Sequence, residues 1–262
     1  MTEPKFSTEV PAGYKIDYYE KPWGRGTRRW YEIDGVRCVS VTEALGIIDD
    51  GKSGGMAWSA ARIWLKGVCH LATTQERNLQ WDNPQWIEDT LKAQKLLHTD
   101  VWGAKTNLGS TIHACLEALC ANEYPALSTF SEDEQPYAKA VMEWWADHDP
   151  KVVATEMLVG SRLHGACGRF DLLYRDADDK LVLADLKTAA QVRPSFAIQT
   201  AAYAGFYAEC GYGDIDAQEV IHVQPDGAYT VVPCTAPYEA FLAILDARNA
   251  FHAVKDEMKK AA

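Results

Sequence analysis

Three features that this 262-residue sequence lacks exclude three classes of protein. Charged residues interrupt every apolar run before it reaches the roughly eighteen residues that a membrane-spanning helix requires. The N-terminal segment MTEPKFSTEVPAGYK has neither the basic nor the apolar region of a secretory signal peptide. The seven cysteines form no CxxC pair, which disfavours a disulfide framework, a zinc ribbon and a cysteine-held cluster. We therefore expect a cytoplasmic protein whose cysteines are small core residues.

An excess of basic residues is also missing. The sequence has 26 Lys and Arg against 37 Asp and Glu, which gives a formal net charge of −11. This charge argues against a protein that coats nucleic acid nonspecifically, because phosphate binding requires a basic surface. It still allows an enzyme with a local basic groove, and a hydrophobic content of 47% is enough to build a sizeable core. Evidence for function must therefore come from particular sites.

Hydrophobic periodicity predicts helices in the first half of the chain and mixed strands and helices in the second. Asp34-Gly35 and Asp226-Gly227 are dipeptides typical of hairpin turns, and each lies between two apolar runs. Helices are predicted over 42–48, 55–73, 86–100, 104–121, 133–148, 195–210 and 238–259, and strands over 30–33, 36–41, 151–159, 168–175, 180–188, 219–225 and 228–234. This order predicts an α/β (α+β) fold whose sheet lies between helical layers. We expect an N-terminal hairpin and helical region over 1–103 and a core over 104–262, within one continuous unit.

The stretch GRFDLLYRDADDKLVLADLKTA, residues 168–189, places charged residues inside an apolar hairpin. The turn-rich DADDK segment centres this hairpin on Asp178, so that Asp171 faces Asp185 across two strands with Lys187 on the same face. Two adjacent carboxylates repel, and each raises the pKa of the other unless a cation lies between them. A divalent metal with hard oxygen ligands, Mg²⁺ or Mn²⁺, is the simplest occupant. The alternative is that one aspartate ends its strand and faces water.

Lys187 adds a cation beside the carboxylate pair. An ammonium group in this position can orient or deprotonate a water and stabilise negative charge that develops on a phosphate oxygen. Asp171 and the DLK sequence that begins at Asp185 resemble the PD-(D/E)XK nuclease superfamily, in which a strand carries the (D/E)xK motif. GRFD, residues 168–171, is similar to the G-x-x-D motif of the RecB-like branch.

Two helical motifs strengthen this resemblance. LGSTIHACLEAL resembles the G-[ST]-x-x-H-x-x-x-E helix of RecB-like nucleases and places His113 and Glu117 on one helical face. QTAAY resembles the Q-x-x-x-Y motif of the same branch and places Gln199 and Tyr203 on one face of a later helix. Glu156 lies in a predicted strand where relatives often carry a glutamate near the site. The alternative is that Glu156 is a charge on an edge strand. Four motifs in the family's order are more specific than any one of them.

The resemblance implies a restriction-endonuclease-like core, with a central mixed β-sheet flanked by helices, and a metal-dependent DNA exonuclease of the phage type. The implied metal ligands, for Mg²⁺ or Mn²⁺, are His113, Asp171, Asp185 and the backbone carbonyl of Leu186. The implied catalytic group is Lys187 with both aspartates, while Gln199 and Tyr203 contact the phosphate or hold the site in place. Supporting positions are Glu117, Glu156 and Thr188.

The same resemblance implies roles in DNA recombination, DNA repair or phage DNA metabolism in a bacterial or phage-infected cell. The implied partners are DNA and a recombination protein such as a single-strand annealing protein. Relatives with an iron–sulphur cluster carry a tight C-terminal cysteine triplet, whereas this C-terminal region has only the widely spaced Cys210 and Cys234, so no cluster is expected. The alternatives are a structure-selective endonuclease with the same site and a noncatalytic DNA-binding or partner-binding module on a nuclease fold. A metalloprotease is disfavoured because the sequence contains no HExxH.

The segment YYEKPWGRGTRRW, residues 18–30, interleaves basic and aromatic residues. Such a pattern suits an unpaired nucleic-acid strand, because cations follow the backbone while rings stack on bases. The alternative is that the aromatic residues fill the core and the arginines pair with acids. The predicted DNA-binding residues are Lys21, Trp23, Arg25, Arg28, Arg29 and Trp30.

Overall fold

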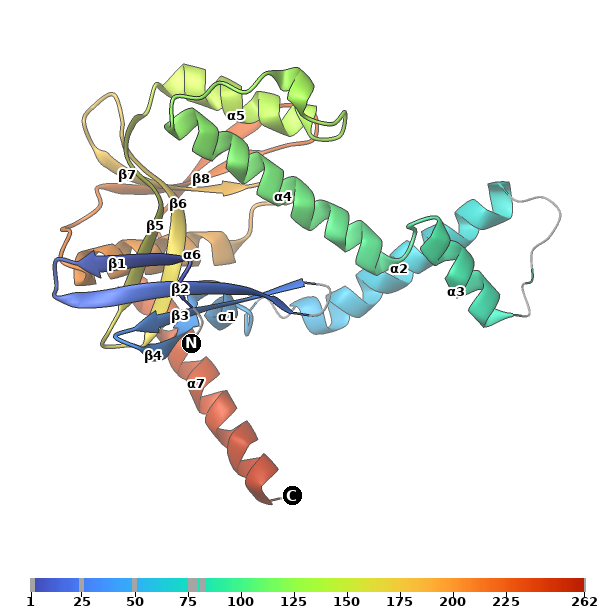
Figure 1. The fold of residues 1–262 in the computed structure, drawn as a ribbon, viewed down its shortest axis with the longest axis horizontal. Helices are drawn as coiled ribbons and strands as arrows, with labels where there is room; N and C mark the ends of the chain where they lie inside the picture. The colour runs from blue at the N-terminus through green and yellow to red at the C-terminus, as the bar shows by residue number, and fades with distance from the viewer. Residues whose placement is uncertain (1–2, 24–25, 49–50, 75–79, 81–82, 262) are drawn as a thin grey trace. The chain divides into compact units, whose positions relative to one another are not determined.

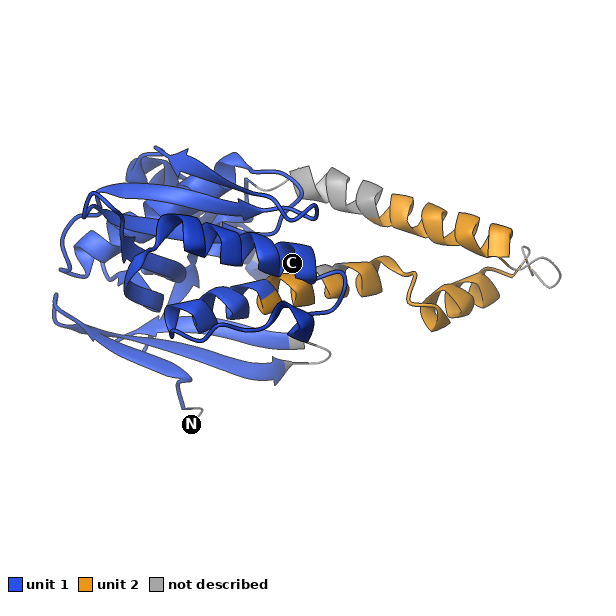
Figure 2. Ribbon diagram, turned by 90° about the horizontal axis from the view of Figure 1, so that it is seen from above, with its two compact units in different colours: residues 1–48, 112–262 blue, residues 49–111 orange. Residues whose placement is uncertain are grey.

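The computed structural model describes residues 3–23, 26–48, 51–74, 80 and 83–261. Its contacts divide the chain into two compact units, which are coloured separately in Figure 2: unit 1 comprises residues 1–48 and 112–262, and unit 2 comprises residues 49–111. This grouping differs from a division at residue 103, because the N-terminal strands pair into the same sheet as the strands of the second half. Within the described residues, no helix combines the length and apolar character needed to cross a lipid bilayer.

Unit 1 is built on a nine-stranded mixed sheet (Figure 1), which confirms the predicted fold class. The strand order is β1-β2-β3-β4-β6-β7-β8-β9, and β5 pairs with the other edge of β6. The pairs β4–β6 and β7–β8 are parallel and the others antiparallel. The strands are β1 (Phe6–Val10), β2 (Tyr14–Trp23), β3 (Gly26–Ile33), β4 (Val36–Ser40), β5 (Lys151–Ser161), β6 (Ala166–Arg175), β7 (Leu181–Lys187), β8 (Ala217–Val223) and β9 (Tyr229–Cys234).

Helices cover both faces of this sheet. α6 (Pro194–Glu209) joins the parallel strands β7 and β8, as such a connection requires, and packs with α1 (Val41–Leu45) and α7 (Tyr238–Ala261). α5 (Gln135–His148) packs against β8 and β9, and Figure 1 shows α5 and α6 on opposite sides of these strands. A short 3-10 turn, η1 (Leu127–Thr129), precedes α5.

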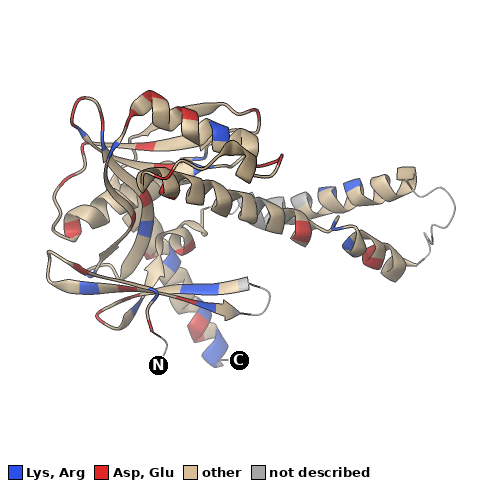
Figure 3. Ribbon diagram, turned by 45° about the horizontal axis from the view of Figure 1, so that its top comes forward, with Lys and Arg blue, Asp and Glu red and all other residues tan. Residues whose placement is uncertain are grey.

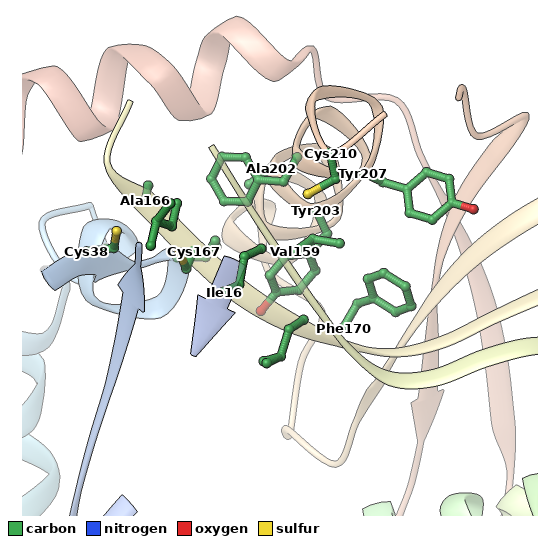
Figure 4. Packing of buried hydrophobic residues seen from close by; sticks show 14 of the residues in the cluster. Ile16, Cys38, Val159, Ala166, Cys167, Phe170, Ala202, Tyr203, Tyr207 and Cys210 are labelled. Carbon is green, nitrogen blue, oxygen red and sulfur yellow. The ribbon is translucent and has the colours of Figure 1, made fainter. Parts of the chain in front are cut away.

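The hydrophobic core of unit 1 lies between β5, β6 and α6 (Figure 4). Phe170 and Tyr203 contribute from β6 and α6, with their ring centroids 6.5 Å apart. Buried cysteines at Cys38, Cys167 and Cys210 fill small spaces in the same cluster, and each has a free thiol. The core therefore extends directly beneath the strand that carries the GRFD motif.

Unit 2 is helical. It contains α2 (Gly51–Thr74), α3 (Pro84–Ala93) and the first part of α4 (His98–Cys120), whose last residues belong to unit 1. A Cβ atom added to Gly67 of α2 would lie 2.7 Å from Cδ2 of Leu91, so the absence of a side chain there lets α2 and α3 pack closely. Trp64 donates a hydrogen bond from Nε1 to Nδ1 of His98 at 3.2 Å, which ties α2 to the start of α4.

Two predictions of secondary structure were wrong. The predicted helix over 86–100 is instead two helices, because α3 ends at Ala93, Lys95 takes a positive φ of 56°, and α4 begins at His98. No strand was predicted before Trp30, yet β1 and β2 occupy residues 6–23. Their polar and aromatic residues pair along an antiparallel ladder whose apolar side is buried, including Ile16 and Tyr18.

Candidate active site

The site forms where β6 changes neighbours. β6 pairs with β4 only as far as Cys167 and with β7 only from Leu172, so residues 168–171 lie between these two ladders. The pairs Leu172↔Ala184 and Leu173↔Leu183 confirm the predicted hairpin register, in which the next opposed residues are Asp171 and Asp185. At that position a hydrogen bond to a side chain replaces the backbone pairing of β6 and β7, because the amide N–H of Leu186 donates to Oδ2 of Asp171 at 2.8 Å. The two carboxylates are thus adjacent on neighbouring strands.

On the β6 side, three side chains form a group that can hold a cation. Nδ1 of His113, from the end of α4, lies 3.3 Å from Oδ1 of Asp171. One ligand atom each from His113, Glu156 and Asp171 lies within 4.8 Å of the others. A nitrogen and carboxylate oxygens at this spacing suit a divalent cation with mixed ligands, such as Mn²⁺ or Mg²⁺.

Glu156 reaches this group through an unusual backbone conformation. Its φ is +51°, a left-handed value that costs energy for any residue with a Cβ atom. This value occurs inside β5. Nε of Arg169 forms an ion pair with Oε2 of Glu156 at 2.7 Å. The guanidinium of Arg169 also lies 5.5 Å from the ring centroid of Phe6 and 5.3 Å from that of Tyr18. Arg169 therefore connects the N-terminal strands to Glu156.

On the β7 side, Asp185 is almost completely buried, with 1% of its side chain exposed. Nζ of Lys187 lies 2.5 Å from Oδ2 of Asp185, and Nε2 of Gln199 donates to Oδ1 at 3.3 Å. Lys187 is therefore the ion-pair partner of Oδ2, although no well-aligned hydrogen bond from a described residue reaches this buried oxygen. A carboxylate oxygen is also the kind of ligand that a hard divalent cation prefers.

Gln199 and Tyr203 form the support for Asp185. Nε2 of Gln199 also donates to the hydroxyl oxygen of Tyr203 at 3.0 Å, and both side chains are buried. Tyr203 lies against Gly168, where an added Cβ would come within 2.3 Å of Cε1 of its ring. Gly168 in the GRFD motif is therefore required for the close approach of Tyr203, and through Gln199 it affects the position of Asp185.

The two carboxylates differ in their electrostatic surroundings. Burial acts to raise the pKa of Asp171, but the adjacent His113 together with Lys187 outweighs it and holds this pKa below its usual value. Burial raises the pKa of Asp185, and the charge of Asp171 adds to the effect, while Lys187 only partly compensates. Burial also raises the pKa of Glu156 to about 7, although Arg169 opposes this change.

The two cations of the site both favour their charged forms. Burial alone would lower the pKa of His113, but Asp171 outweighs it and raises this pKa to about 9. Burial likewise acts to lower the pKa of Lys187, and Asp185 with Asp171 outweighs it and raises the pKa above its usual value. Nζ of Lys187 also lies 5.2 Å from the ring centroid of Phe196, which helps to fix the ammonium group.

Among the remaining predicted residues, Leu186 belongs to the site, because its amide donates to Asp171. Glu117 is exposed on α4, and its charge acts on Glu156. Thr188 follows β7 and is partly exposed, and Leu186 is buried in β7. Arg169 was not predicted from the sequence, although its place inside GRFD beside a motif carboxylate was a sign that could have been used.

The predicted DNA-binding segment forms the β2–β3 hairpin. The rings of Tyr19 and Trp30 stack with centroids 4.9 Å apart, and Nζ of Lys21 lies 5.9 Å from the centroid of Trp30. Arg28 and Arg29 are exposed, and Nε of Arg29 lies 3.2 Å from Oε1 of Glu20. Arg25 and the side chain of Trp23 lie outside the described residues. This segment's role in DNA binding stays a prediction.

Comparisons with known proteins add little. No family model matches the sequence, and no curated protein matches it. The chain is similar to the crystal structure of SSO0001, with 13% identity, coverage of 83% of this chain and 76% of that chain, and a TM-score of 0.39. It is also similar to an alkaline exonuclease (LHK-Exo) from Laribacter hongkongensis, with 14% identity, coverage of 56% and 82%, and a TM-score of 0.30. Likenesses this slight carry no argument about function, which rests on the site itself.

Proposed function

We propose that this protein is a divalent-metal-dependent deoxyribonuclease of the PD-(D/E)XK type, RecB-like branch. The observation that carries the proposal is the convergence of imidazole, carboxylate and ammonium groups where one edge of β6 changes its partner from β4 to β7. His113 comes from a helix, while Asp171 and Asp185 come from adjacent strands of one hairpin. A solvent-facing pair of strand-end aspartates would not be expected to recruit a partly buried lysine and a buried glutamine.

The metal would be held by His113, Asp171 and Glu156, with Asp185 and the carbonyl oxygen of Leu186 as further ligands. When bound, Mg²⁺ or Mn²⁺ supplies Lewis-acid activation of the scissile phosphate and a lowered pKa for attacking water. The donor set supports this assignment because it combines one nitrogen with several carboxylate oxygens. No iron–sulphur cluster is proposed.

The protein's own groups have separate tasks in this proposal. Lys187, which is held as a cation, faces the negative charge that grows on the phosphate as water attacks. Gln199 positions Asp185 by donating to Oδ1, and Tyr203 fixes Gln199 in turn. Both of these side chains are buried, which supports positioning rather than direct contact with the phosphate. The rate gain would come from alignment and charge stabilisation, without a covalent intermediate.

We propose further that the enzyme acts from DNA ends and leaves a 5′-phosphate and a 3′-hydroxyl. Its proposed setting is DNA recombination, DNA repair or phage DNA metabolism in the cytoplasm, where a single-strand annealing protein would be a fitting partner. The exposed Arg28 and Arg29 of the β2–β3 hairpin would contribute contacts to the DNA backbone.

A nuclease assay tests this proposal. Purified protein is incubated with end-labelled linear DNA or closed circular DNA, in Mn²⁺, Mg²⁺ or excess chelator. We expect degradation of the linear DNA with either metal, at least as fast in Mn²⁺ as in Mg²⁺, and no degradation in chelator. Cutting of the circle would favour a structure-selective endonuclease with the same site. Undiminished cutting in chelator, or DNA binding without any cutting, would contradict a metal-dependent nuclease.

A further inference from the structure

A groove in unit 2 has the features of a binding site outside the proposed catalytic centre. It has a volume of about 630 Å³, within the range of pockets that hold small ligands. Arg62, Lys66 and His70 line it from α2. They are four residues apart, so their side chains project from one helical face about 6 Å apart along the axis.

Arg62 and Lys66 of this groove have no acidic partner within ion-pair distance among the described residues, and both are exposed. In unit 1, by contrast, Arg169, Lys187 and Arg248 each pair with an acid. Two unpaired cations with a nearby imidazole therefore form a local positive site on a protein of net charge −11.

The charge of unit 2 as a whole supports the same point. Residues 49–111 contain seven Lys or Arg and seven Asp or Glu, so unit 2 has no net charge and unit 1 carries the entire excess of acid. Figure 3 shows basic positions along the helix α2 and acidic positions spread over unit 1. An anion would thus meet less repulsion at unit 2 than at unit 1.

The other lining of the groove is apolar. Ile63 lies on α2 between the cations, and Leu96 and Val101 come from the α3–α4 turn and from α4. An anion with apolar parts, such as a chain of nucleotides, matches a row of cations beside an apolar floor. The groove is too small for a duplex, which is about 20 Å across, but it has room for one or two nucleotides of a single strand.

We propose that this groove binds a single strand of DNA, with successive phosphates against Arg62, Lys66 and His70 and with sugar or base edges against Ile63, Leu96 and Val101. The inference rests on the proposed function in that the strand would belong to the nuclease's substrate. Because the described lining contains no Phe, Tyr or Trp ring, binding would depend on charge more than on stacking, and would weaken steeply with salt.

The test compares the double variant Arg62→Gln/Lys66→Gln with Lys255→Gln/Lys260→Gln, which removes the same charge from exposed positions on α7. Affinity for fluorescent oligothymidylate is measured in Ca²⁺ from 50 mM to 1 M salt. Two lost phosphate contacts should lower the slope of log K against log salt by about 1.4. If the two lines meet near 1 M, this slope corresponds to an affinity loss of about 60-fold at 50 mM. The α7 control should match wild type, and Arg62→Lys should retain most of the affinity because it keeps the charge.

The arms of the experiment separate the two proposals. Failure of the wild-type protein to cut linear DNA would contradict the proposed nuclease, whatever the groove binds. The groove assignment would be overturned if the wild type cuts linear DNA normally but Arg62→Gln/Lys66→Gln binds oligothymidylate with the affinity and salt slope of the wild type. An equal loss of affinity for blunt duplex would also overturn it, because the groove would then not be specific for a single strand. A loss confined to oligouridylate would replace DNA by RNA as the ligand.

Discussion

The two halves of the candidate site carry the same residue type in opposite surroundings. Asp171, on β6, accepts a backbone hydrogen bond and lies beside an imidazole, so its pKa is lowered. Asp185, on β7, is buried beneath a lysine and a glutamine, and its pKa is raised. The two halves therefore differ in chemistry. The β6 half contains the group of side chains that could hold a cation, and the β7 half contains a buried carboxylate with the ammonium group that faces it.

The largest effect should come from removing either carboxylate. We expect Asp171→Asn and Asp185→Asn each to reduce turnover to the detection limit, because each removes a proposed metal ligand while keeping the side-chain shape. In chelator their effects on stability should differ. The charge of Asp171 stabilises the fold and the charge of Asp185 opposes its own burial, so Asp171→Asn should lower the melting temperature more than Asp185→Asn does.

Turnover and thermal melting of both variants, with and without Mn²⁺, check this prediction. Mn²⁺ should raise the melting temperature of wild type and should raise that of each variant less. Wild-type turnover in either variant would remove that aspartate from the metal site. Equal losses of stability in chelator would show that the two carboxylates are not electrostatically distinct.

A smaller effect should follow from removing the ammonium group of the β7 half. Lys187→Met keeps the length and apolar stem but loses the charge, so the growing charge on the phosphate loses a fixed partner. Such a loss costs about 3–4 kcal/mol, or roughly 10²–10³ in turnover. DNA affinity in Ca²⁺ should fall only by about one phosphate contact in its salt dependence, and Mn²⁺ affinity should hold or rise because a nearby positive charge is removed. If DNA and metal binding collapse together with turnover, Lys187 is a structural residue.

The hairpin of the site could be predicted from the sequence because its determinants are local. Turn residues at 176–180 and apolar runs on both sides fix the register, and the structure has the expected pairing around Leu172↔Ala184. The helix that carries His113 could also be predicted from its period. Both features depend on residues close together in the chain.

The parts that could not be predicted depend on contacts between distant segments. The sequences of β1 and β2 are polar and aromatic and do not show a buried side. Which residues of these strands are buried depends on the sheet that they join. The sequence left Glu156 between a position near the site and an edge-strand charge, since nothing in its neighbours reveals a φ of +51°. Arg169 gains its role only when Phe6 and Tyr18, from the N-terminal strands, stack beside it.

The smallest effect on turnover should come from a substitution of Glu156. This substitution tests whether the charge of Glu156 lowers the stability of the fold while it increases the affinity for the metal. Glu156→Gln keeps size and backbone strain but removes a charged ligand, so half-saturation should need about 10–100 times more Mn²⁺, with turnover largely restored at high metal. The same variant should be more stable than wild type in chelator at pH 8. The pKa of Glu156 is raised by burial from 4.5 to about 7, so the folded protein binds its proton more tightly than the unfolded chain does. Wild-type stability therefore falls as pH rises from about 4.5 to about 7, by up to about 3 kcal/mol from this group.

Melting of wild type, Glu156→Gln and Arg169→Met in chelator at pH 5 and pH 8 completes the comparison. Glu156→Gln should gain stability relative to wild type at pH 8 and much less at pH 5, where Glu156 is already protonated in the folded state. Arg169→Met should show the opposite sign, because it leaves the carboxylate of Glu156 without the guanidinium 2.7 Å away. Adding Glu156→Gln to Arg169→Met in a double variant should recover part of that loss. An advantage of Glu156→Gln that is the same at both pH values would mean that packing, and not the buried charge, sets the energy of this strained residue.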